Sequence, residues 1–107
     1  MKPLVFLGSS RDDLLAMPRA VRHGIGVELL RVQFGALPSD FKPMTAVGPG
    51  AHEIRVRDAS GAYRAIYVAK FDAAIYVLHA FQKKTQQTAR ADLELAKLRY
   101  RMIGAKS

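Results

Sequence analysis

Cysteine is absent from this chain of 107 residues. The absence excludes a disulfide framework, a thiolate nucleophile and a zinc site with cysteine ligands. The histidines His23, His52 and His79 are too scattered to indicate a metal site. No apolar run approaches the roughly 20 residues of a membrane span, and the N-terminal residues lack the apolar stretch of a signal peptide. We therefore expect a cytoplasmic protein without membrane segment, metal or other cofactor.

Acidic residues are scarce. Asp and Glu number 9 against 17 Lys and Arg, which gives a formal charge of +8. Such a field attracts nucleic acid, an anionic membrane or an acidic protein, and it also occurs in domains that are merely soluble. Half of the residues are hydrophobic, so the chain can bury a core. We expect one domain over residues 1–107.

The first half of the chain predicts one strand and two helices. Leu4–Leu7 reads as a short buried strand, and Ser10 as the N-cap of a helix that runs to Met17. A second helix follows Pro18, because apolar residues then recur at helical spacing and Gly35 is a stop signal. The recurring residues are Val21, Ile25, Leu29 and Val32. Gly24 and Gly26 weaken the middle of this helix.

The second half predicts an antiparallel meander and a last helix. Residues 35–50 read as a long connection. Strands then cover 52–58, 63–71 and 74–83, with Ile54 and Val56 facing inward and Glu53, Arg55 and Arg57 outward. Thr88 is placed to cap a final helix. The fold class is therefore α+β, with an N-terminal strand, two helices, three strands and a C-terminal helix.

Residues 77–88 combine an apolar strand with a basic end. His79 lies within the apolar run, and Lys83 and Lys84 close it. Because strand side chains alternate between faces, Lys83 shares a face with His79 and Phe81, and Lys84 lies on the other face. This arrangement indicates a binding site for a polyanion at the sheet edge, with the ionisable side chain of His79 close by.

Short motifs follow one another along the chain in an order that resembles a known family. They are Ser9-Ser10-x-x-Asp13-Leu14, Arg22 with Gly24 and Gly26, Lys42-Pro43-Met44, Gly48-x-Gly50-x-x-Glu53-Ile54-Arg55, Gly61-x-Tyr63-Arg64 and Leu78-His79-x-Phe81-x-Lys83-Lys84-Thr85. The chain resembles the phage-derived branch of the RelE/HigB toxins, in the RelE/ParE superfamily, over roughly Pro3 to Tyr100.

The resemblance implies the toxin of a type II toxin–antitoxin module. Such a toxin is a small α+β endoribonuclease that cleaves mRNA, typically on the ribosome, and a small helix-turn-helix antitoxin holds it inactive. Metal-free cleavage makes the 2′-hydroxyl attack the adjacent phosphate, and it needs a base, an acid and cations for the phosphorane charge. Two alternatives stay open: a toxin of the same fold that inhibits DNA gyrase without catalysis, and a phage-derived RNA- or protein-binding module.

Three residues are the catalytic candidates. The resemblance places Arg64 in the active cleft, where a guanidinium suits phosphorane charge, although it could instead pair with Glu53 across the sheet. It also places Lys83 where it aids proton transfer or holds the scissile phosphate. His79 is the natural acid or base by its ordinary pKa, or else a hydrogen-bonded core residue.

RNA-binding candidates surround these residues. They are Arg55, Arg57, Tyr63, Lys70 and Lys84, for which packing or a solvated face is the alternative. Some relatives carry a tyrosine or histidine just behind the basic strand end. Here that tract is Thr85-Gln86-Gln87-Thr88, so the sequence leaves the general acid unassigned.

Overall fold

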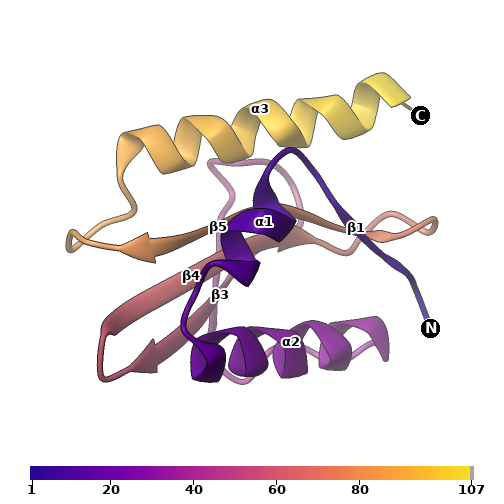
Figure 1. Ribbon diagram of the computed structural model, residues 1–107. Helices are drawn as coiled ribbons and strands as arrows, with labels where there is room; N and C mark the ends of the chain where they lie inside the picture. The colour runs from indigo at the N-terminus through magenta and orange to yellow at the C-terminus, as the bar shows by residue number, and fades with distance from the viewer. Residues whose placement is uncertain (107) are drawn as a thin grey trace.

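Helices cover both faces of one mixed sheet (Figure 1). The protein is described by a computed structural model over residues 1–106. Its five strands are ordered β1-β5-β4-β3-β2, with β1 parallel to β5 and the other pairs antiparallel. The elements in chain order are β1 (Leu4–Phe6), α1 (Ser10–Leu15), α2 (Arg19–Gln33), β2 (Phe41–Pro43), β3 (Ala51–Asp58), β4 (Gly61–Val68), β5 (Ile75–Lys83) and α3 (Arg90–Lys106). The α+β fold class is confirmed.

The second helix forms as its apolar spacing predicts. Val21, Ile25, Leu29 and Val32 are all buried, and they pack on the face of the sheet that carries Ile54 and Tyr67. The helix is continuous through its two glycines. A methyl group at Gly24 would lie 3.3 Å from a Val56 side-chain carbon, so this glycine permits the close approach of α2 to β3.

The opposite face of the sheet packs against α3. Its core includes Ile66 and Leu78 from the sheet and Ala96 and Ile103 from α3. β4 and β5 read as nearly continuous apolar runs because both faces of the sheet are covered. Glu53 is therefore buried at 1% exposure, although alternation alone had placed it on a solvated face. The predicted shared face of Glu53, Arg55 and Arg57 is confirmed. The expectation that Glu53 points outward into solvent is wrong.

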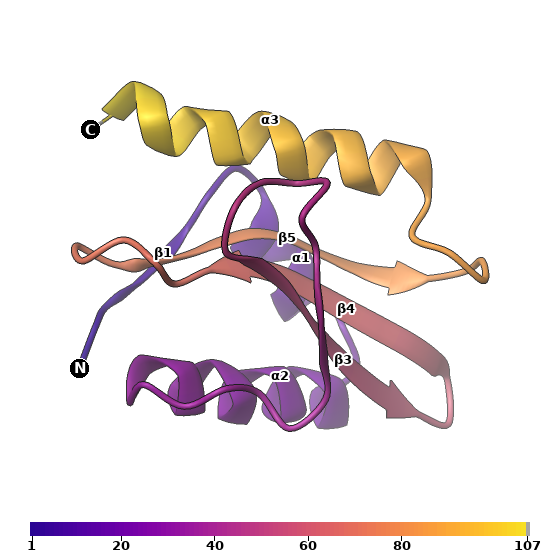
Figure 2. The same cartoon turned by 180° about the vertical axis from the view of Figure 1, so that it is seen from behind.

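The meander of β3, β4 and β5 is confirmed, but some strand ends differ from the prediction. β4 runs from Gly61 to Val68 instead of from 63 to 71, and residues 35–50 contain the short edge strand β2, which the sequence did not predict. Figure 2 shows this connection rising from α2 to α3. At its far end the Tyr100 hydroxyl donates a hydrogen bond to the Pro49 carbonyl oxygen at 2.6 Å.

A bulge in β5 sets the faces of its last residues. Ile66 pairs with His79, but the next residue, Tyr67, pairs with Val77, so Leu78 is an extra residue between them. Its carbonyl oxygen accepts a hydrogen bond from Arg99 Nη1 at 2.9 Å. The inserted residue turns the end of β5, so that His79 shares the face of α3 with Leu78.

Both predicted N-caps are wrong. Helix α1 starts at Ser10 itself, whose buried hydroxyl donates to the Val77 carbonyl oxygen at 3.1 Å. Helix α3 starts at Arg90, and the Thr88 hydroxyl donates instead to Glu53 Oε2 at 2.9 Å. Tertiary acceptors thus take two hydroxyls that local capping rules assigned to helix ends.

Candidate functional site

Basic side chains line one hollow near the end of β3, the start of β4 and the end of β5. The hollow has a volume of about 430 Å³, and we call it the basic hollow. Its lining is Arg57, Ala62, Arg64, Lys83, Lys84, Thr85 and Gln86. A smaller hollow of about 130 Å³ adjoins it, and Arg57 and Arg64 line both. None of the residues that line the basic hollow is acidic, so it can receive an anion without electrostatic competition from its own lining.

Strand register brings these cations together. Arg55 pairs with Arg64 across β3 and β4, and Ala62 pairs with Lys83 across β4 and β5. Residues opposite one another share a sheet face, so Arg55, Arg64 and Lys83 all lie on the α3 side. The predicted shared face of Arg55 and Arg57 follows from the same register and is confirmed.

Arg64 is the most buried cation of the basic hollow, with 7% exposure. Its Nε lies 3.4 Å from Glu53 Oε1, and its Nη1 donates to the Tyr63 carbonyl oxygen at 3.1 Å. Burial lowers the pKa of Arg64, while the Glu53 carboxylate acts in the opposite direction. The ion pair considered from the sequence is therefore present, and it coexists with the position of Arg64 in the basic hollow.

Lys83 and Lys84 line the same hollow, contrary to the predicted separation of the two side chains. The strand ends at Lys83, so the alternation of faces stops before Lys84. Burial lowers the pKa of Lys83, and the charge of Arg64 lowers it further. The result is a partly exposed ammonium group that gives up its proton more readily than an ordinary lysine.

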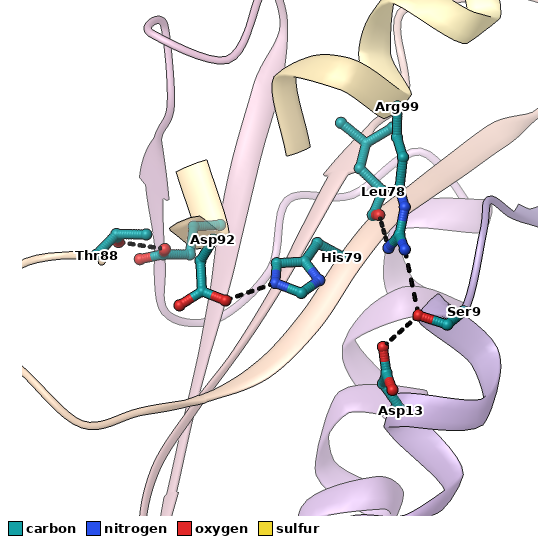
Figure 3. A network of polar contacts seen from close by, with 8 residues as sticks. Ser9, Asp13, Leu78, His79, Thr88, Asp92 and Arg99 are labelled. Carbon is teal, nitrogen blue, oxygen red and sulfur yellow. Dashed lines mark hydrogen bonds and ion pairs between the residues drawn. The ribbon is translucent and has the colours of Figure 1, made fainter. Parts of the chain in front are cut away.

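His79 lies apart from the basic hollow, in contact with α3. Its Nε2 is 2.7 Å from Asp92 Oδ1 (Figure 3), and its ring stacks on Phe81 with centroids 4.8 Å apart. His79 is 6% exposed, and among the described residues its Nδ1 has no hydrogen-bond partner. The shared face of His79, Phe81 and Lys83 is confirmed. The contacts of His79 are those of the alternative interpretation, a hydrogen-bonded core residue.

Two predicted RNA-binding residues are not brought to the basic hollow. Tyr63 lies on the opposite face of the sheet in the core under α2, and its hydroxyl contacts Ser60 Oγ at 2.6 Å. Lys70 lies beyond the other end of β4, with its Nζ 5.2 Å from the Phe71 ring centroid. The structure therefore groups Arg55, Arg57 and Lys84 with Arg64 and Lys83, and separates Tyr63 and Lys70 from them.

Three residues that sequence reasoning did not select contact the candidate residues. Glu53 and Thr88 contact each other beneath the cations, and Asp92 holds His79. The sequence carried weak signals for two of them. Glu53 sits between arginines in an alternating strand, and Thr88 was assigned a capping role. Nothing in the local pattern around Asp92 indicates that it meets His79.

The part of the chain that the structure describes offers neither a metal site nor a membrane-spanning helix. Within residues 1–106, no group of three His, Asp or Glu side chains is placed to hold a metal ion. In the same part of the chain, no helix is both long and apolar enough to cross a lipid bilayer.

The fold and the basic hollow together define a class: a small α+β protein with a cation-lined surface suited to phosphate groups. A comparison with family models identifies it further. The model of the phage-derived Gp49-like proteins (DUF891) matches residues 12–101, so the chain belongs to this family. The family is associated with RelE-like toxins. No curated protein matches the chain. The narrower resemblance to RelE/HigB toxins stays a prediction.

Proposed function

We propose that this protein is the toxin of a type II toxin–antitoxin module and a metal-independent endoribonuclease that cleaves mRNA on the ribosome. The basic hollow carries the proposal: four cations from β3, β4 and the end of β5 surround one space whose lining has no carboxylate. Membership of the Gp49-like family supports a toxin-like role.

In the proposed reaction the 2′-hydroxyl oxygen attacks the adjacent phosphorus, and the bond from phosphorus to the 5′-oxygen breaks. The 2′-hydroxyl loses its proton to solvent or to a ribosomal group. Arg64 holds the non-bridging oxygens, whose charge grows in the transition state. Much of the rate comes from forcing the mRNA into an in-line geometry, which needs no strong acid or base.

Lys83 is the proposed proton donor to the leaving 5′-oxygen. It lines the basic hollow beside Arg64, and its pKa is lowered by burial and by that guanidinium. His79 was the acid or base candidate by residue type. Since its Nε2 contacts Asp92 and the residue is 6% exposed, we assign it to holding the end of β5 against α3.

The proposed partners follow from the same charges. The basic hollow takes the mRNA phosphates during cleavage. An antitoxin with a helix-turn-helix domain, encoded next to the toxin, would inhibit it by placing an acidic segment over the hollow. Co-purification of the two products from one operon would test this pairing.

The test is cleavage of a reporter mRNA in a translating extract, with primer extension to map the cuts. We expect cleavage by the wild type and a loss of about 100-fold or more for Arg64→Ala, because a donor to the transition-state charge is gone. Arg31→Ala is the matched control, since Arg31 is exposed on α2, on the other face of the sheet.

Two outcomes would contradict the proposal. Equal cleavage by a folded Arg64→Ala variant would remove the site assignment. Growth arrest with intact mRNA and induced DNA damage would favour a gyrase-inhibiting toxin instead.

A further inference from the structure

A buried carboxylate lies beneath the basic hollow and contacts two separate segments. Glu53 is 1% exposed, and its Oε1 lies 3.4 Å from Arg64 Nε and 3.8 Å from Arg55 Nε. Its other oxygen, Oε2, accepts a hydrogen bond from the Thr88 hydroxyl at 2.9 Å. Glu53 therefore joins the arginines of the sheet to the segment that follows β5.

The segment held by Thr88 carries part of the basic hollow. Lys84, Thr85 and Gln86 line the hollow and lie outside any helix or strand, between the end of β5 and the start of α3. The side-chain bond of Thr88 to Glu53 is thus a direct link from this irregular segment to the sheet.

The contacts of Glu53 exclude the other role open to a carboxylate beside RNA. A general base must reach the proton that it removes. Both carboxylate oxygens of Glu53 are directed at protein groups, and the side chain is closed to solvent. A buried carboxylate without partners would be costly, and here the cations and the hydroxyl compensate that cost.

We infer that Glu53 is a positioning residue: it fixes the Arg64 guanidinium and, through Thr88, the Lys84–Thr88 segment around one phosphate. The inference rests on the proposed function for its effect on cleavage. Its structural part, the link between Arg64 and the segment, stands independently of cleavage.

Glu53→Gln tests the charge with little change of shape. We expect the variant to bind a 2′-deoxy-substituted, uncleavable RNA as tightly as the wild type or more tightly, because one negative charge has left a cationic site. We expect its single-turnover cleavage rate constant to fall by about 100-fold, the size of effect that small displacements of reacting groups produce. A role in stability alone would lower the melting temperature without this split between binding and rate.

Thr88 provides a test that leaves the buried charge in place. Thr88→Val removes the hydroxyl group while keeping a similar side-chain volume. We expect the cleavage rate constant to fall by about 10-fold, the size of effect that the loss of one hydrogen bond produces. Thr88→Ser restores the donor and should recover most of the rate. Thr45→Val, at an exposed position in residues 35–50, is the matched control.

An NMR measurement makes failure of the inference distinct from failure of the proposed function. The Arg64 side-chain Nε–H resonance should shift or broaden in Glu53→Gln, and backbone resonances of Thr85 and Gln86 should shift in Thr88→Val. If the wild type does not cleave RNA but these changes occur, the proposed function fails and the link stands. Unchanged resonances, or folded variants with wild-type rates, would overturn the inference.

Discussion

At the scale of single residues, Lys83 carries a charge that its surroundings disfavour. Its pKa is lowered by burial and then by Arg64, with Glu53 acting in the opposite direction. A proton donor works in its protonated form, which exists below the pKa. The cleavage rate should therefore be constant at lower pH and fall as the pH rises through the lowered pKa, before an ordinary lysine would titrate.

Lys83→Arg separates charge from proton donation. Arginine keeps the cation at every accessible pH but does not release its proton. We expect RNA binding to persist, the rate to fall by about 100-fold or more, and the alkaline decline to disappear from the pH–rate profile. Lys84→Arg is the control, for which we expect the wild-type profile. An unchanged profile in Lys83→Arg would mean that another group donates the proton.

The alternation of side chains along the strands predicted which residues of the site share a face, but it did not predict which of them are buried. Alternation correctly placed Lys83 with His79 and Phe81, because the face of a strand residue is a local property. It could not show that Glu53 is buried, because that depends on packing from α3 and the segment before it. It also failed at Lys84, because the strand ends one residue earlier.

At the scale of elements, Arg99 fastens α3 to the sheet and to α1. Its Nη1 donates to the Leu78 carbonyl oxygen at the bulge, and its Nη2 donates to Ser9 Oγ at 3.2 Å (Figure 3). The guanidinium lies over Gly8, where a methyl carbon would be 2.5 Å from Arg99 Nε. Gly8 also has a φ of +55°, which disfavours any other residue.

Gly8→Ala should therefore destabilise the protein by about 2 kcal/mol or more, from backbone strain and the displaced guanidinium. Gly26→Ala is a matched glycine on α2, where a methyl group would meet no atom within 4 Å. It should stabilise the helix by up to about 1 kcal/mol. Urea denaturation of both variants measures the two effects. Equal stability of both would contradict this account of α3 docking.

Element prediction succeeded where the pattern was periodic. The apolar stripe from Val21 to Val32 predicted α2, and all four of its residues are buried. It failed for β2, since Phe41–Pro43 is too short to show a period and pairs only because β3 offers a free edge. The sequence pattern also did not predict the bulge at Leu78, because a bulge depends on how neighbouring strands pair.

At the scale of the whole molecule, the +8 charge is distributed over both sides of the sheet. Arg57, Arg64, Lys83 and Lys84 surround the basic hollow, whereas Arg19 and Arg31 are exposed on α2 on the other face. Both groups contribute to long-range attraction of RNA. Only cations that touch phosphates release condensed counterions, so salt dependence distinguishes contact from attraction.

Binding of an uncleavable single-stranded RNA, measured by fluorescence anisotropy over a series of salt concentrations, tests which cations make that contact. If Lys84 and Arg57 each hold one phosphate, Lys84→Ala and Arg57→Ala should each reduce the slope of log Kd against log salt by about 0.7. Arg31→Ala removes the same charge from α2 and should leave the slope unchanged, with at most a small uniform loss of affinity at low salt. Equal slope changes for all three variants would mean that RNA binds through the diffuse charge of the molecule. The assignment of the basic hollow as the RNA-binding site would then be wrong, because removing a charge from either face of the sheet would change the salt dependence equally.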